Sequence, residues 1–167
     1  YHYTVTATTR PRRSAETEGA DYFFVTEEEF RKTVRDGELL EWAEVYGHLY
    51  GIPKSQVISA LGEGWDVIIE ADVQGAATLR QLAPDAVFIF LAPPSLEELA
   101  RRLGMRMTES SNALEVRLCT AEAEMVEAGN FDHVVTNHRD RLDDTVNEIE
   151  AIVARERTRL PPRNIAL

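Results

Sequence analysis

Continuous apolar segments alternate with helix-forming segments from residue 53 onward. Three short runs, Val67–Ala71, Val87–Ala92 and Val134–Thr136, have the length and β-branched content of buried strands. Buried strands that alternate with helices predict an α/β fold, in which helices cover both faces of a parallel sheet. Helices are predicted at residues 53–61, 75–82, 95–103, 113–128 and 140–159.

The first 52 residues have a different pattern, which predicts a small mixed lobe. A helix is expected after Thr26, because Thr26 and Glu29 form a capping box while Val25 and Phe30 form a hydrophobic staple. Gly37 is expected to end that helix. Strands are predicted at residues 3–8, 22–25, 39–46 and 49–50.

Composition limits the classes of protein to consider. A length of 167 residues fits one domain, or one domain with an inserted lobe. The 29 acidic residues exceed the 18 basic ones, and a net charge of -11 argues against nucleic acid or a membrane surface as partner. The single cysteine, Cys119, excludes an internal disulfide, and no apolar run reaches the roughly 18 residues of a membrane span. We therefore expect a cytoplasmic protein.

Positive charge is concentrated in one loop of this acidic chain. Arg10, Arg12 and Arg13 lie within four residues of one another, directly after a predicted strand. A guanidinium can donate two parallel hydrogen bonds to phosphate oxygens, so the loop is a candidate site for a dianionic phosphate. A solvated basic loop is the alternative interpretation.

Two carboxylates are candidates for reading a nucleotide base. Glu41 stands in a predicted strand and Asp72 follows an apolar one. Together they could accept hydrogen bonds from N1–H and the exocyclic amine of guanine, and they would reject adenine, whose N1 is an acceptor. Glu41 could instead be an outward-facing strand residue, and Asp72 a helix cap or the holder of a magnesium-bound water.

A second basic group consists of Arg102, Arg106 and Arg117, on two predicted helices and the loop between them. These arginines could close as a lid over transferring phosphates, or they could be surface charge near a helix end. Two separate arginine sets suggest two phosphate-bearing ligands that meet.

With these motifs in place, the sequence resembles the guanylate kinase family from Tyr3 to about Arg157. The resemblance implies a P-loop-kinase-like parallel sheet flanked by helices, with an inserted mixed α/β GMP-binding lobe and a helical lid. The implied boundaries are about 6–52 for the lobe, 53–102 and 118–159 for the core, and about 103–117 for the lid. The motifs that carry it are T-T-R-P-R-R at 8–13, E-G-A-D-Y at 18–22, E-W-A at 41–43, D-V-Q-G at 72–75, A-P-P-S at 92–95 and V-V-T-N at 134–137.

The resemblance implies transfer of the γ-phosphoryl group of ATP to GMP, giving ADP and GDP, with Mg²⁺ bound together with ATP. It also implies roles for individual residues, none of which is a metal ligand. The residues expected to bind GMP are Thr6, Arg10, Arg13, Tyr22, Glu41, Tyr50 and Asp72. Those expected on the ATP side are Arg102, Arg106 and Asn137, and those expected to act in catalysis are Arg10, Arg106 and Arg117.

The chain departs from the family pattern in one major respect, because it contains no G-x-x-x-x-G-K-[ST] phosphate-binding loop. In the family this loop and its strand precede the point that Tyr1 matches, so we expect an upstream segment. A parallel sheet without its central strand would leave backbone groups unpaired. Ile52, Met105 and Met107 also differ from the residues that the family has at the matching positions, and these differences leave the nucleotide preference open.

Two other functions remain open. The chain could be an inactive module that binds GMP or a phosphopeptide through the same lobe, or a kinase of another small phosphorylated substrate. The presence of both Glu41 and Asp72 argues against a phosphopeptide or another small phosphorylated substrate as the ligand, because neither offers a guanine to read. The oligomeric state is also open, with a homodimer among the alternatives.

Overall fold

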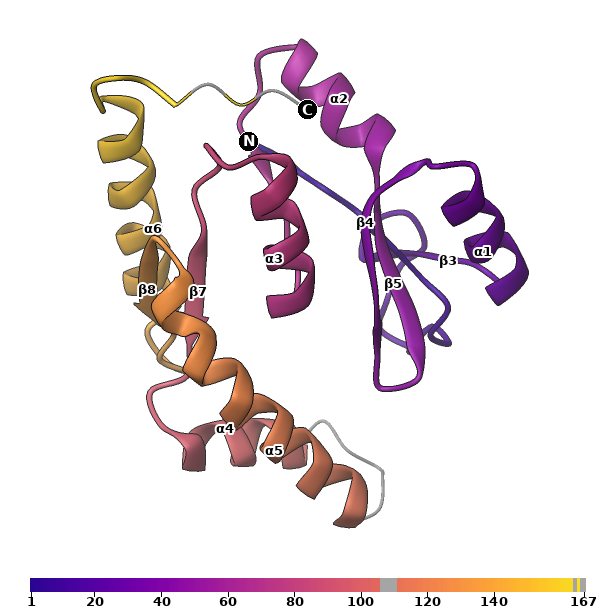
Figure 1. Ribbon diagram of the computed structural model, residues 1–167. Coiled ribbons are helices and arrows are strands. Elements are labelled where there is room, and N and C mark those ends of the chain that lie inside the picture. Colours follow the sequence, from indigo (N-terminus) through magenta and orange to yellow (C-terminus); the bar gives the residue numbers. More distant parts are fainter. Residues whose placement is uncertain (106–110, 164, 166–167) are drawn as a thin grey trace. The chain divides into compact units, whose positions relative to one another are not determined.

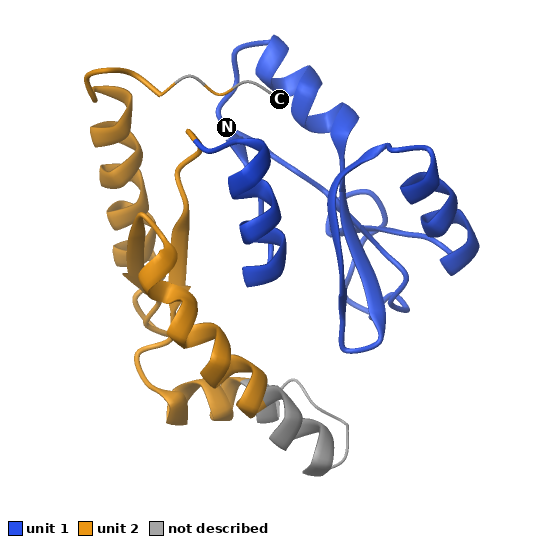
Figure 2. Ribbon diagram, in the orientation of Figure 1, with its two compact units in different colours: residues 1–84, 166–167 blue, residues 85–165 orange. Residues whose placement is uncertain are grey.

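The computed structural model describes residues 1–105, 111–163 and 165, and the side chains at 103–105 and 111–117 are not part of the description. The chain divides into two compact units, one formed by residues 1–84 and the other by residues 85–165 (Figure 2). We describe each unit by itself.

Unit 1 contains a mixed four-stranded sheet, a parallel strand pair and three helices (Figure 1). The sheet has the order β3-β2-β5-β4, and the second pair is β1 with β6. The elements are β1 (His2–Tyr3), β2 (Thr6–Thr8), β3 (Tyr22–Phe24), α1 (Glu27–Arg35), β4 (Leu39–Val45), β5 (His48–Pro53), α2 (Lys54–Gly62), β6 (Val67–Ile68) and α3 (Val73–Leu82).

The strands β4 and β5 form a hairpin whose turn consists of Tyr46 and Gly47. Both turn residues have positive φ, 51° and 77° respectively. Two positive values match the turn type whose twist suits a two-residue hairpin, and glycine adopts such a φ at little cost. The hairpin thereby holds Glu41 on β4 and Tyr50 on β5 in one sheet.

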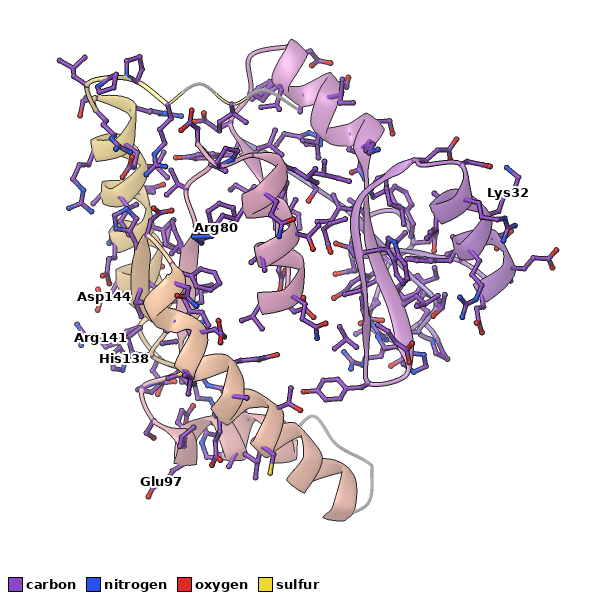
Figure 3. All side chains as sticks on the ribbon, in the orientation of Figure 1. Lys32, Arg80, Glu97, His138, Arg141 and Asp144 are labelled. Carbon is purple, nitrogen blue, oxygen red and sulfur yellow. The ribbon has the colours of Figure 1, made fainter. Side chains whose placement is uncertain are left out.

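Helix α1 packs its single buried face on this sheet. Thr26 caps the helix by accepting a hydrogen bond from the Glu29 backbone at 3.3 Å, and Glu29 accepts one from the Thr26 backbone at 2.8 Å, as the capping box predicted. Phe30 is 1% exposed and joins Leu39 in the core. Lys32 projects from the opposite face of α1 into solvent (Figure 3).

The prediction of one strand over residues 3–8 is wrong. The backbone pairs with β6 up to Thr4, whose N–H donates to the Ile68 carbonyl at 3.0 Å, and then changes sheets. At the crossing the Gln56 side chain accepts from the Val5 N–H at 2.9 Å and donates to the Val5 carbonyl at 2.8 Å. A side chain 51 residues away therefore satisfies the backbone between the two short strands.

The predicted strand over residues 67–71 is also shorter than expected. Only Val67 and Ile68 pair in β6, and Glu70 lies beyond the ladder, where it accepts a hydrogen bond from the Tyr3 hydroxyl. Asp72 is then the N-cap of α3 rather than the last residue of a strand. β6 pairs in parallel with β1, which belongs to a segment that the sequence analysis assigned to the mixed lobe.

Unit 2 is built on one parallel strand pair, with His133 to Thr136 in register with Ile89 to Ala92. Val135 is fully buried, whereas Leu91 and Val134 keep about half of their surface exposed. Leu91 is in register with Val135 and faces the same side, whereas Val134 faces the other side. Within the described residues, each face of the pair is therefore only partly covered, contrary to the prediction of strands buried on both faces. The elements are β7 (Ile89–Ala92), α4 (Leu96–Met105), α5 (Ser111–Val126), the 3₁₀ helix η1 (Glu127–Asn130), β8 (His133–Thr136) and α6 (Leu142–Arg157).

A polar network anchors the segment that follows α6. Arg163 forms an ion pair of 2.7 Å with Glu156 and donates to the carbonyl oxygens of Asp85 and Ala86 at 3.3 and 3.1 Å. The Arg163 hydrogen bond, with a second one from His133, lowers the pKa of Glu156 to about 2. Both partners of the ion pair are about 15% exposed, so Arg163 is held next to α6 by a largely desolvated interaction.

Replacing Arg163 with alanine should therefore destabilise unit 2. We expect the free energy of unfolding, measured by urea denaturation, to fall by about 1–3 kcal/mol, because Glu156 and two carbonyl groups lose their donor. Arg159 is the matched control, since it approaches the same carboxylate at 3.8 Å but is half exposed. Arg159→Ala should cost less than about 0.5 kcal/mol; equal losses for the two variants would contradict the assigned role of Arg163.

Candidate functional site

The two candidate base-reading carboxylates meet at the first turn of α3. Glu41, on β4, places its carboxylate directly against Gly75: a Cβ atom at Gly75 would lie 2.9 Å from both Cδ and Oε2 of Glu41. Asp72 caps the same turn, where its Oδ1 accepts a hydrogen bond of 2.7 Å from the Gly75 N–H. The structure therefore brings Glu41 and Asp72 to one helix end, although 31 positions separate them in the sequence.

Glu41 is an unsatisfied buried acceptor. Its side chain is 7% exposed, and its Oε2 atom has no hydrogen-bond partner among the described residues. Burial, and secondarily the nearby charge of Asp72, raises the pKa of Glu41 to about 7. The interpretation of Glu41 as an outward strand residue is therefore wrong. A buried acceptor without a donor is unfavourable, and a ligand that brings N–H groups would relieve that cost.

Arg10 is the centre of a second cluster, which includes three of the predicted phosphate-binding residues. Its guanidinium lies 5.3 Å from the centre of the Tyr22 ring and 5.8 Å from the centre of the Phe24 ring. The rings of Tyr22 and Tyr50 meet edge to face at 6.2 Å. The rings of Tyr22 and Phe24 thus orient a single guanidinium, which limits the loss of side-chain entropy when an anion binds.

Glu16 is a member of this cluster that the sequence analysis missed. Its carboxylate pairs with Arg10 at 2.7 Å and accepts a hydrogen bond of 2.8 Å from the Arg13 backbone. Arg12 donates to the Glu16 carbonyl oxygen. The Arg13 guanidinium is 59% exposed, and its distance of 3.5 Å from the Glu16 carboxylate is longer than that of Arg10. The sequence signal that could have indicated this pairing is a carboxylate three residues after the three clustered arginines. Glu16 folds the loop so that Arg10 is held and Arg13 stays open to solvent.

All of the residues expected to bind GMP lie in unit 1, and the four-stranded sheet carries most of them. Thr6 on β2 is in register with Tyr22 on β3, and Glu41 and Tyr50 occupy β4 and β5. No hydrogen bond between Thr6 and Glu41 is described, so the expected help of Thr6 at the base stays a prediction. Arg10 and Arg13 follow β2 directly, which places the phosphate candidates beside the same sheet.

On the predicted ATP side, the structure brings Arg102 and Asn137 together in unit 2. Arg102 donates to the Asn137 carbonyl oxygen at 2.9 Å and to Glu98 at 2.8 Å. Hydrogen bonds from Arg101 and Arg102 lower the pKa of Glu98 to about 2. Arg106 lies outside the described residues, as does the side chain of Arg117, so their predicted roles stay predictions.

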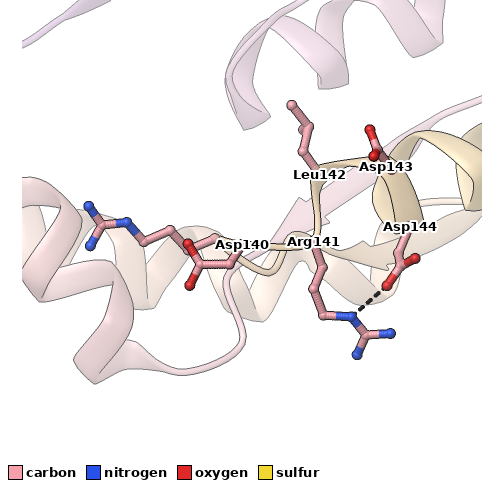
Figure 4. A pocket seen from close by; sticks show the side chains of 6 residues that line it. Asp140, Arg141, Leu142, Asp143 and Asp144 are labelled. Atoms are coloured by element: carbon pink, nitrogen blue, oxygen red, sulfur yellow. Dashed lines mark hydrogen bonds and ion pairs between the residues drawn. The ribbon is translucent and has the colours of Figure 1, made fainter.

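A shallow polar pocket of about 410 Å³ lies at the start of α6, lined by residues 139–144 (Figure 4). Arg141 donates to Asp144 along one side of it. The pocket contains none of the predicted site residues. Across the described part of the chain, no three His, Cys, Asp or Glu side chains gather as metal ligands, and no helix has the length and apolar character of a membrane span.

The fold and the site fit the class of nucleotide-binding α/β proteins, and comparison with known proteins identifies the family. A sequence profile described as guanylate kinase matches residues 1–156. The chain therefore belongs to the guanylate kinase family.

Individual relatives agree with this assignment. The chain is 44% identical over 165 residues to guanylate kinase 2, chloroplastic/mitochondrial, of Oryza sativa, covering 98% of the chain and 58% of that relative. It is 45% identical over 158 residues to guanylate kinase of Thermotoga maritima, covering 95% of the chain and 75% of the relative. The crystal structure of guanylate kinase from Anaplasma phagocytophilum superposes with a TM-score of 0.82 at 33% identity, covering 95% of the chain and 77% of that structure.

The raised pKa of Glu41 makes the stability of the chain depend on pH. The folded-state pKa of about 7 exceeds the ordinary value of 4.5, so the folded state holds the Glu41 proton more tightly than the unfolded state. The free energy of unfolding should therefore fall as the pH rises through about 7 and Glu41 ionises. Glu41→Gln is neutral throughout, so it should raise the free energy of unfolding by about 1–3 kcal/mol at about pH 8.5 and change it little at about pH 5.

Urea denaturation at the two pH values measures this difference. Glu44→Gln is the matched control, since Glu44 lies on the same strand with an exposed side chain. A Glu41→Gln variant whose stability advantage is the same at both pH values would contradict the assigned pKa.

Proposed function

We propose that the protein phosphorylates GMP, with ATP as donor, and forms GDP and ADP. The observation that carries this proposal is the Glu41–Asp72 pair, a buried and unsatisfied acceptor next to a second carboxylate. Guanine supplies two neighbouring donors, N1–H and the 2-amino group, whereas adenine presents an acceptor at N1 and has no 2-amino group. A phosphopeptide offers neither pattern, so the buried pair supports a nucleotide as the ligand.

The GMP phosphate would bind at the Arg10 cluster. The exposed guanidinium of Arg13 and the oriented one of Arg10 offer charge-assisted donors, and the hydroxyl groups of Tyr22 and Tyr50 offer neutral ones. Glu16 already neutralises part of the Arg10 charge at 2.7 Å, which keeps the loop folded when no anion is bound. Arg10 would also stabilise the charge that spreads over the transferred phosphoryl group.

The residues proposed for the ATP side are Arg102, Arg106 and Asn137, and Arg106 and Arg117 are proposed to act in catalysis, as the family resemblance implies. In this mechanism the reaction needs no covalent intermediate, because catalysis of phosphoryl transfer rests on positioning and on electrostatic stabilisation. Magnesium would enter with ATP as part of the substrate, and the described residues provide no cluster of ligands for it. The proposed lobe at 6–52, core at 53–102 and 118–159, and lid at 103–117 follow the family resemblance.

Two further parts of the proposal concern the protein's surroundings. A cytoplasmic location is supported by the single cysteine, which is exposed and free. A homodimer is supported only by the family resemblance, and sedimentation velocity of the purified chain distinguishes it from a monomer.

The proposed activity is tested by GMP-dependent formation of ADP from ATP and magnesium on the purified chain, with AMP and CMP as alternative acceptors. We expect ADP formation to require GMP, because only guanine satisfies both carboxylates. Calorimetric titration with GMP alone separates binding from turnover. A folded chain that binds GMP without forming ADP would contradict the kinase and support a GMP-binding module. A chain that does not bind GMP would contradict both the kinase and the GMP-binding module.

Arg10→Ala should weaken GMP binding without weakening the binding of guanosine. The variant loses a guanidinium that would contact the phosphate, and we expect about tenfold to hundredfold lower affinity for GMP. The comparison with guanosine assigns the loss to the phosphate. Arg31→Ala is the control, because Arg31 is 55% exposed on α1 and pairs only locally with Glu27. Equal losses for GMP and guanosine would mean that Arg10 supports the fold rather than the phosphate.

A further inference from the structure

Gly75 lies against both candidate base-reading carboxylates. A Cβ atom at this position would lie 2.9 Å from Cδ, 2.9 Å from Oε2 and 3.0 Å from Oε1 of Glu41, so it would collide with the whole carboxylate. On its other side, the N–H of Gly75 donates to Asp72 Oδ1 at 2.7 Å. Gly75 thus determines where one carboxylate can lie and orients the other.

The backbone conformation does not require glycine at position 75. Gly75 is in the first turn of α3 and is not among the glycines with positive φ, a conformation that would favour glycine. In a helix interior, glycine is less favourable than alanine by roughly 1 kcal/mol. Local helix stability therefore favours alanine, and the space occupied by the Glu41 carboxylate is the feature that excludes it.

We propose that Gly75 is a positioning residue for base selection, which leaves room for the Glu41 carboxylate beside Asp72 so that the two can accept from guanine together. This inference rests on the proposed function, in which Glu41 and Asp72 read the base. Gly75 itself has no side chain with which to contact the nucleotide, and its effect is exerted through Glu41 and Asp72.

The contact predicts a specific kind of defect. The three atoms nearest to a methyl group at position 75 all belong to the end of the Glu41 side chain. The carboxylate can swing away while the strand and the helix stay in place. Gly75→Ala should therefore keep its fold and its phosphate-binding cluster, and lose discrimination between bases. A merely structural role would instead lower stability and weaken all nucleotides alike.

The measurement is the ratio of the dissociation constants for AMP and GMP, obtained by calorimetric titration of the chain. Both nucleotides carry the same phosphate, so the ratio reports on the base alone. We expect Gly75→Ala to lower the preference for GMP at least about tenfold, with AMP binding little changed. Gly62→Ala is the matched control, because Gly62 is also a helical glycine and a methyl group there would meet nothing within 4 Å; its ratio should equal that of the wild type.

A double-mutant cycle with Glu41→Asp identifies the partner. Aspartate is shorter by one methylene and withdraws the carboxylate from position 75. In that background, adding Gly75→Ala should change the GMP preference by less than about threefold. Should Gly75→Ala fail to fold by circular dichroism, recovery of folding in the Glu41→Asp/Gly75→Ala double variant would support the same contact, and no recovery would refute it.

The possible failures are distinguishable. A wild-type chain with no preference for GMP over AMP would overturn the proposed function, and this inference with it. A wild type that prefers GMP, combined with a Gly75→Ala variant of unchanged preference, would overturn the inference alone. The same would follow if Gly75→Ala reduced the preference equally with glutamate and with aspartate at position 41.

Discussion

The site of unit 1 depends on one contact, in which the Glu41 carboxylate is pressed against the first turn of α3. Glu41 lies on strand β4 of the hairpin, and Asp72 and Gly75 lie at the start of α3, which faces it. The contact buries a carboxylate beside a second one, which raises the pKa of Glu41 to about 7 instead of stabilising its charge. Local unfavourable electrostatics of this kind are a recognised property of binding sites, which are stabilised by the rest of the fold.

The same contact explains how a chain of net charge -11 could select an anionic ligand. The base end of the site is negative and unsatisfied, whereas the loop at Arg10–Arg13 gathers positive charge beside the same sheet. Glu16 offsets part of that positive charge and orients Arg10, and the exposed Arg13 keeps its guanidinium available. The opposed charges match a molecule that has hydrogen-bond donors at one end and a phosphate at the other.

Local sequence signals predicted the start of α1, which Thr26 and Glu29 specify. The predicted strand over residues 39–46 extended one residue into the hairpin turn, which Tyr46 and Gly47 form with positive φ. Predictions were wrong where distant groups intervene. The side-chain amide of Gln56 replaces strand pairing at Val5, a contact that no window of neighbouring residues contains. In unit 2, the alternation of apolar strands and helices predicted the parallel pairing of β7 with β8, but not the exposure of Leu91.

By itself, the sequence determined which residue types were present and in what order, and this was enough for the family, the fold class and the candidates Glu41, Asp72 and Arg10. Only the tertiary structure decided that Glu41 is buried, that Glu16 pairs with Arg10, and that Gly75 lies against a carboxylate. The physical reason is that pKa values, ion pairs and steric limits depend on distances between atoms. Such distances are established by the packing of β4 on α3 and by the folding of the arginine loop, not by the spacing of residues along the chain.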